Sequence, residues 1–301
     1  MRITTIVAAA VTSILMIAGA HAQEGARAYF PVPAGTNDAE LTGTYVHTET
    51  STVTADSFTI TPSYRRALDL FGDAGTFLIG IPVGRVSGTI TGLGAQDSGL
   101  GQGDMFIGGT VGLINAPALT PQGYVQYQPG FTASAVGRVF IPTGAYDSKK
   151  AMNLGGNRWS FEAMLPMSFI MGQSLVDPTL TTFEVIPSVQ VFTDNTNPYT
   201  PFPGIITKTG QAPLFGVEAH VTHSFSPMVW ASADAYGKLG GETSINGVGQ
   251  ADGQQSLALG ATLGLTLSQS FATRFSYQHD VYSKNSKANG STFMATAAFL
   301  F

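Results

Sequence analysis

Two neighbouring segments of the sequence carry ionisable side chains at alternate positions. Glu218 and His220 are two residues apart in the segment 214–224, and Asp234 has the same kind of place in the segment that follows. Residues i and i+2 of an extended strand point to one face. With a tight turn between the segments, we expect Glu218 to lie opposite Asp234 and His220 opposite Ser232. Two opposed carboxylates would favour protonation of one of them, or recruit Arg274 or another cation.

The same alternation gives most extended segments one polar face. Charged groups in a narrow interior are costly unless they are hydrated or paired, so an inward-facing set of them is a candidate solute pathway. An internal salt network that fills the interior is the alternative, and within it we expect Arg138 and Glu162 to bridge each other. Besides Lys238, the set comprises Arg65, Arg138, Arg158, Glu162, Glu184, Glu218, His220, Asp234, Arg274 and Asp280.

A serine and a histidine occur together in HDVYSKNSKANGS, residues 279–291. A lipid-modifying enzyme on the outer wall of a barrel would need its serine and its base about 3 Å apart. We expect the hairpin here to pair His279 nearer Phe293 than Ser291. The sequence therefore predicts no catalytic residue and no enzyme, with a lipid-modifying barrel as the third reading of the function.

No motif indicates a cofactor or a metal. The glycine-rich stretch at residues 92–104 is followed by a strand pattern instead of the helix that a phosphate-binding loop requires, so we expect an outer loop. The acidic loops around Asp194 and Asp252 do not match a calcium-binding loop. His220 and His223 point to opposite faces of one strand, and the five histidines show no metal-ligand spacing.

The elements that position these residues are alternating strands. In residues 255–268 the odd positions from Leu257 to Leu267 are apolar, whereas the even positions are small or polar. This period of two is the strongest structural signal in the chain. About twelve such segments occur, at residues 41–50, 58–68, 76–84, 105–113, 131–141, 157–169, 183–192, 214–224, 228–238, 255–268, 270–282 and 291–301.

The alternation of apolar and polar residues is compatible with an exported β-barrel and with a β-sandwich. Connections between the segments are tight at one end, as at residues 224–227 and 268–270, and mostly longer at the other, as at residues 193–212. Long outer loops over short inner turns are typical of outer-membrane barrels, in which an even strand number brings both termini to one side. We therefore predict an all-β fold: a transmembrane, antiparallel, up-and-down β-barrel of about 12 strands.

The amino terminus resembles a secretory leader. Arg2 precedes an apolar run over residues 3–20, and Ala20-His21-Ala22 has the small-x-small pattern of a cleavage site. We predict a signal peptide at residues 1–22 and a barrel over residues 23–301, against the alternative of an uncleaved anchor helix.

Composition supports export to a membrane. Only 11% of the 301 residues are charged, there is no cysteine, and the net charge is -5 with no basic run. The low charge fits a surface that faces lipid, and the acidic balance makes nucleic acid an improbable partner.

The last segment, residues 291–301, ends on an aromatic residue. Phe293 and Phe299 would face lipid while Thr292 and Thr296 face inward, so this strand would close the ring against the first one and remove the last unpaired edge. A terminal Phe301 on such a strand also resembles the signal that the barrel assembly machinery recognises.

Three short motifs suggest a family. Residues 139–146 (VFIPTGAY), residues 153–159 (NLGGNRW) and residues 101–104 (GQGD) resemble those of the meta-pathway phenol-degradation outer-membrane family. The resemblance implies an exported, transporter-like barrel in a bacterium that degrades aromatic compounds. It lends no catalytic residue to any position of this chain.

We therefore predict a channel in the outer membrane of a Gram-negative bacterium. Its expected partners are outer-membrane lipid and a small, aromatic or weakly polar solute that crosses by passive diffusion. A non-conducting structural or surface-contact barrel is the alternative.

Overall fold

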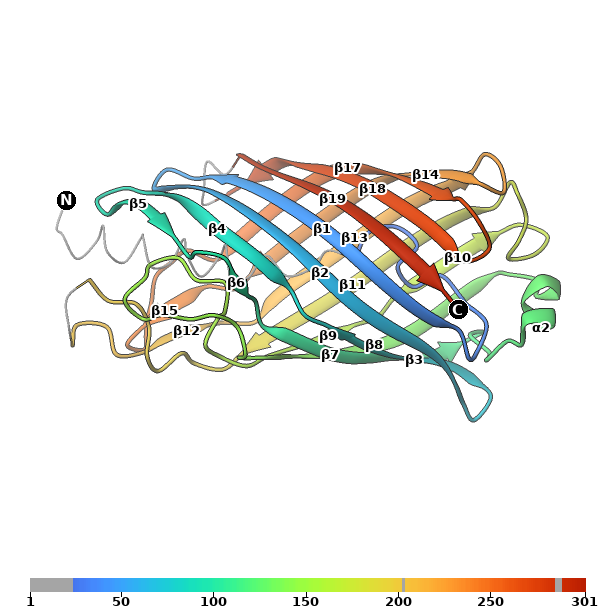
Figure 1. Ribbon diagram of the computed structural model, residues 1–301, viewed down its shortest axis with the longest axis horizontal. Helices are drawn as coiled ribbons and strands as arrows, with labels where there is room; N and C mark the ends of the chain where they lie inside the picture. The colour runs from blue at the N-terminus through green and yellow to red at the C-terminus, as the bar shows by residue number, and fades with distance from the viewer. Residues whose placement is uncertain (1–23, 202–203, 285–288) are drawn as a thin grey trace.

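The chain folds into a closed β-barrel in a computed structural model that describes residues 24–201, 204–284 and 289–301 (Figure 1). The predicted signal peptide lies outside the described residues. Strand β1 pairs with both β2 and β19, so the antiparallel sheet closes on itself. The wall strands are β1 (Asn37–Glu49), β2 (Val53–Leu70), β3 (Asp73–Gly80), β4 (Val83–Ile90), β7 (Met105–Ile114), β8 (Phe131–Ile141), β9 (Ser160–Met164), β10 (Met167–Met171), β11 (Thr181–Phe192), β13 (Leu214–Ser224), β14 (Val229–Gly240), β17 (Gln254–Thr266), β18 (Phe271–Ser283) and β19 (Asn289–Leu300).

Two of the twelve wall positions are interrupted strands. β3 and β4 both pair with β2 and are separated at Ile81 and Pro82, and β9 and β10 both pair with β11 and are separated at Leu165 and Pro166. Proline has no N–H to give to the ladder, which accounts for a break at each place. The predicted count of about twelve is confirmed, but the uninterrupted segments predicted at residues 76–84 and 157–169 are wrong.

The two ends of the barrel differ. At the end that carries the carboxyl terminus, β2–β3, β13–β14 and β17–β18 are joined by short turns, and the six-residue helix α2 (Pro121–Gln126) lies in the longer β7–β8 connection (Figure 1). No helix among the described residues is long and apolar enough to span a membrane. Because outer-membrane barrels have short turns on the periplasmic side, this is the turn end and the opposite end is the extracellular, or loop, end.

The loop end carries short strands of its own. β5 (Gly94–Asp97) and β6 (Gly101–Gln102) pair with β4, so the glycine-rich stretch expected to be only a loop is partly strand. β12 (Thr209–Gln211), β15 (Thr243–Ile245) and β16 (Val248–Gly249) form a separate three-stranded sheet. These additions place ordered structure over the mouth of the barrel.

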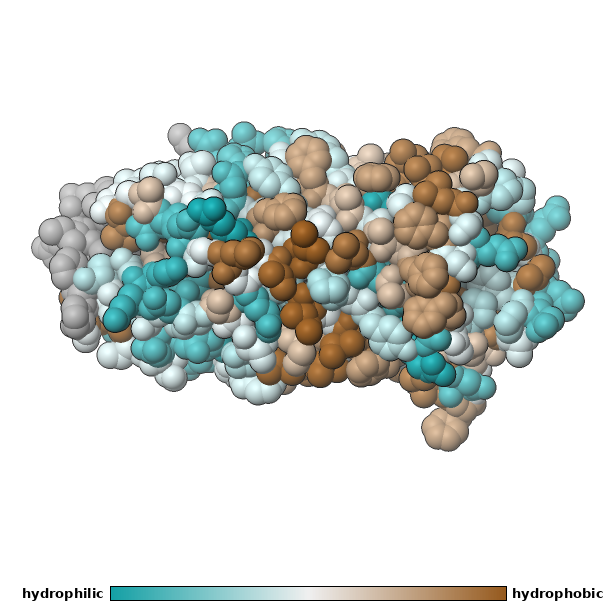
Figure 2. All heavy atoms as spheres, viewed as in Figure 1, coloured by the Kyte–Doolittle hydropathy of each residue, from teal (hydrophilic) through white to brown (hydrophobic). Residues whose placement is uncertain are grey.

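Apolar side chains cover the outside of the barrel. The exposed fractions of Leu257, Leu263 and Phe299 are 39%, 43% and 51%, so these residues face outward and do not meet in a dry centre. Figure 2 shows apolar residues gathered over the middle of the visible face and polar residues toward the loop end. The alternation therefore separates a lipid-facing wall from a polar interior, as in a transmembrane barrel and unlike in a sandwich.

The terminal strand closes the ring as predicted. In the β1–β19 register, Ala39 lies opposite Phe299 and Tyr45 opposite Phe293. The backbone N–H of Asn37 donates to the carbonyl of Phe301 at 2.9 Å, and the N–H of Phe301 donates back at 3.0 Å. The pairing leaves no unpaired backbone edge at this seam. Such an edge would be costly because lipid cannot form hydrogen bonds with free N–H and C=O groups.

Candidate functional site

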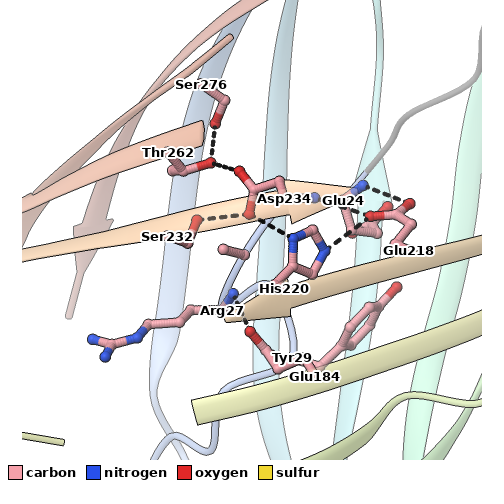
Figure 3. A network of polar contacts seen from close by, with 12 residues as sticks. Glu24, Arg27, Tyr29, Glu184, Glu218, His220, Ser232, Asp234, Thr262 and Ser276 are labelled. Carbon is pink, nitrogen blue, oxygen red and sulfur yellow. Dashed lines mark hydrogen bonds and ion pairs between the residues drawn. The ribbon is translucent and has the colours of Figure 1, made fainter. Parts of the chain in front are cut away.

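The barrel interior is occupied by the chain that precedes β1. We call residues 24–36 the N-terminal segment. The backbone N–H groups of Glu24 and Arg27 donate to the carboxylates of Glu218 and Glu184, at 3.2 and 3.0 Å (Figure 3). Glutamates of the wall thus satisfy backbone donors that would otherwise be buried without a partner.

An ion pair holds Glu24 in place. The Glu24 carboxylate binds the guanidinium of Arg138, which is 4% exposed and also donates to the Tyr29 hydroxyl at 3.1 Å. Glu162 lies 3.8 Å from the same guanidinium, in direct register with Arg138 across β8 and β9. The predicted Arg138–Glu162 bridge is confirmed, with Glu24 as the closer partner.

Arg27 anchors the segment further toward the turn end. Its guanidinium donates to the hydroxyls of Thr222 and Ser224, at 3.2 and 3.0 Å, and lies 4.7 Å from the ring centroid of Trp230. Gly264 of β17 lies opposite Trp230 of β14, and a Cβ atom at this position would overlap the indole ring. The glycine therefore makes room for the ring on which Arg27 stacks.

His220 is the fully buried centre of a polar network. Its side chain is 0% exposed, its Nδ1 lies 2.8 Å from Asp234 Oδ1, and its Nε2 lies 3.4 Å from Glu218 Oε2. Ser232 and Thr262 each donate to Asp234 at 2.7 Å (Figure 3). The imidazole therefore connects the carboxylate that binds the N-terminal segment to a carboxylate fixed by two hydroxyls.

The expected register of this hairpin is wrong by two residues. His220 lies opposite Asp234, and Glu218 lies opposite Tyr236. Ser224 lies opposite Trp230, whereas a pairing of Glu218 with Asp234 would have placed it opposite Met228 and given a turn shorter by two residues. The two carboxylates consequently do not face each other, and His220 lies between them.

A cavity of about 620 Å³ lies beside the N-terminal segment and extends to loop residues such as Asn153 and Gln250. This volume is within the usual range of small-molecule sites. One part of its lining is rich in hydroxyl groups, from Thr42, Thr59, Thr61, Ser276, Thr292 and Thr296. Apolar and aromatic groups contribute another part, from Leu78, Phe106, Phe140, Leu154, Tyr236 and Met294.

The predicted pathway residues occupy different and partly overlapping places in the structure. Arg65, Arg138, Arg274 and Asp280 line the cavity. Glu184 and Glu218 contact the N-terminal segment directly. Glu162 contacts Arg138, and His220 lies between Glu218 and Asp234. Arg158 lies apart from the cavity lining, where it donates to Gln211 at 2.5 Å and stacks on Phe192.

Arg65 and Arg274 also bind the N-terminal segment. They donate to the carbonyls of Ala28 and Ala26, at 3.0 and 3.3 Å. Both also lie within 3.8 Å of Glu40. The N-terminal segment itself was not predicted as part of the site; its only signal in the sequence was the pair of charges, Glu24 and Arg27, directly after the predicted leader.

The three family-like motifs meet at the loop end. The carboxylate of Asp104 accepts hydrogen bonds from the backbone N–H groups of Gly144 and Gly156, at 2.9 and 2.8 Å. Gly144 and Gly155 pack so closely that a Cβ atom on either would overlap the other's backbone. Burial raises the pKa of the Asp104 carboxyl, against the opposing effect of the two N–H donors. These motifs therefore fix the long loops to the barrel wall.

Within the described ranges, no cluster of three or more His, Asp or Glu residues could hold a metal ion. The polar groups of the interior are engaged instead with one another and with the N-terminal segment. The hydroxyl, aromatic and charged groups that line the cavity can contact a solute.

A closed barrel with a lipid-facing apolar wall and a polar interior defines a transmembrane β-barrel of the bacterial outer membrane. The chain belongs to the family described as "Putative MetA-pathway of phenol degradation", whose model matches residues 32–296. Among curated proteins, none matches the chain in sequence.

Solved structures show the same fold at low sequence identity. The COG4313 outer membrane channel from Pseudomonas putida F1 has a TM-score of 0.73 and 17% identity, over 90% of this chain and 97% of that one. The translocator domain of the autotransporter NalP from Neisseria meningitidis has a TM-score of 0.54 and 10% identity, over 98% and 99% of the two chains.

Proposed function

We propose that the chain is an outer-membrane channel for passive uptake of small, aromatic or weakly polar molecules. The observation that carries the proposal is the 620 Å³ cavity, in which a hydroxyl-rich lining and an aromatic lining face the same space. A solute with one polar group on an apolar ring can satisfy both linings at once. The family to which the chain belongs and the channel of similar fold support this reading.

The N-terminal segment sets the condition for passage. Because it is bound by Glu184, Glu218 and Arg138, it obstructs the part of the interior between the cavity and the turn end. Solute passage to the periplasm then requires the segment to shift. The inward charges serve in this scheme as a releasable anchor.

Proteoliposome swelling tests the solute class. Phenyl glucoside is larger than methyl glucoside, so simple sieving would admit it more slowly. We expect the purified barrel to admit phenyl glucoside faster, and Phe106→Ala, which shortens an aromatic group of the cavity, to remove that preference. Phe77→Ala on the outer wall is the matched control. Swelling no faster than that of lipid alone, for either solute, would favour the non-conducting structural barrel.

A further inference from the structure

A serine and a histidine contact each other on the outer wall. His279 of β18 lies directly opposite Ser291 of β19, and its Nδ1 is 3.0 Å from the serine Oγ. The expectation that His279 pairs nearer Phe293 is wrong, because Tyr277 occupies that place and its ring packs on Phe293 at 4.6 Å. The distance is that of a nucleophile and its base.

The row continues across the seam of the barrel. On the other side of β19, His47 of β1 lies opposite Ser291 and also opposite Asp56 of β2. The Nδ1 of His47 is 2.9 Å from Asp56 Oδ1. Four adjacent strands thus present His279, Ser291, His47 and Asp56 side by side at one level.

This row borders aromatic side chains on the outer wall. Two residues further from the loop end, Tyr277, Phe293 and Tyr45 form an aromatic row on the same three strands, with ring centroids 4.6 and 6.4 Å apart. Aromatic girdles mark the boundary between hydrocarbon and head groups. A lipid that lies against this face would therefore contact the polar row and the aromatic rings together.

We propose that Ser291 and His279 form a lipid-facing site that hydrolyses fatty-acyl esters of the outer leaflet. Ser291 Oγ attacks the ester carbonyl while its proton passes to His279 Nδ1. Collapse of the tetrahedral intermediate expels the lipid alcohol, which takes that proton, and leaves an acyl-serine. Water then attacks the acyl group with His279 as base, releases the fatty acid and restores Ser291.

A neighbouring hydroxyl group can stabilise the negative charge that develops on the carbonyl oxygen of the ester during the attack. The Tyr277 hydroxyl lies 3.5 Å from Ser291 Oγ, within reach of an oxyanion formed at the attacked carbon. The His47–Asp56 pair flanks the other side of the serine and is a positioning pair for the lipid. The side chains of Ser291 and His279 share the outward face with Tyr277, which is 43% exposed, although the cavity reaches Ser291 and His47 from the other side of the wall.

The first test measures fatty acid release by the full chain in mixed micelles, with phospholipid in one arm and lipopolysaccharide in the other. We expect release in at least one arm, which identifies the source of the ester. Ser291→Ala and His279→Gln should each lower the rate at least about a hundredfold. Solute flux should stay unchanged in both variants, which separates this site from the channel.

The matched control is His223→Gln. His223 Nδ1 lies 2.8 Å from the Thr181 hydroxyl, in a similar cross-strand pair at the turn end, and its loss should leave hydrolysis unchanged. A fluorophosphonate probe should label the wild type and not Ser291→Ala. Absence of release in both arms, release that survives Ser291→Ala, or no labelling of the wild type would overturn the proposal.

Discussion

The backbone N–H of Glu24 donates to the carboxylate of Glu218, 3.2 Å away, although 194 residues separate the two. Glu184, on the neighbouring strand, accepts in the same way from Arg27. The wall therefore binds the backbone of the N-terminal segment as well as the side chains of Glu24 and Arg27. The two backbone contacts depend on the carboxylates of the wall and not on which side chain the segment carries at these positions.

A charge on the lipid-facing wall should destabilise the barrel. Leu263 lies toward the turn end of β17 and faces outward, so Leu263→Lys should lower the free energy of unfolding by up to about 4 kcal/mol. Denaturant titration in lipid vesicles measures the change. Ser256→Lys, on the cavity side of the same strand, is the control and should cost much less; an equal loss in both would contradict the assigned faces.

Removal of the enclosed imidazole should be costly. His220→Ala leaves Asp234 and Glu218 without their shared partner, and breaking a buried pair in this way costs about 3–5 kcal/mol. The temperature at which the folded band disappears in heat-modifiability gels should fall accordingly. His223→Ala, on the outward face of the same strand, should leave that temperature nearly unchanged. A stable His220→Ala barrel would show that the network contributes little.

Loss of the Asp104 carboxylate should loosen the long loop at residues 142–159. Asp104→Ala leaves the N–H groups of Gly144 and Gly156 without their acceptor, at a cost of about 1–3 kcal/mol. Trypsin cleavage after Lys149 and Lys150 should become faster. Asp69→Ala, which removes a similar acceptor from the turn at Gly72, is the control and should not change that rate.

Phe301 should matter for assembly more than for stability. Its side chain is 62% exposed, so Phe301→Ala should leave the unfolding temperature of refolded barrel unchanged. If the assembly machinery reads the terminal aromatic, the amount of barrel inserted in cells should fall several-fold. Leu267→Ala, at another exposed site near the turn end, is the control. Normal insertion of Phe301→Ala would remove this role.

The fold was predictable because the period of two is a local property. The apolar face of each strand can be read from its own residues, as from Leu257 to Leu267. The alternation of the last strand, residues 291–301, also predicts that this strand closes the barrel against the first one. The breaks at Pro82 and Pro166 were also present in the sequence as prolines. They were missed because alternation continues across them.

The site was less predictable because register and long-range contacts are not local. A slip of two residues keeps every side chain on its face, so alternation could not distinguish Glu218 from His220 as the partner of Asp234. The same kind of error hid the contact of His279 with Ser291. The N-terminal segment has no alternation at all, and its place beside Arg138 depends on partners more than a hundred residues away.

A reversible lock on the N-terminal segment tests the central claim most directly. The chain has no cysteine, and an ideal Cβ atom at Gly25 lies 4.0 Å from Ser276 Oγ, so Gly25→Cys with Ser276→Cys brings two thiols within reach of a disulfide that holds the segment in the barrel, at the cost of backbone strain because Gly25 has a φ of +76°. In proteoliposomes we predict solute flux near that of lipid alone under oxidising conditions and restored flux after reduction, with each single-cysteine variant unaffected by either condition. Equal flux in the oxidised and reduced states, or no flux in either, would contradict a channel that opens by movement of this segment.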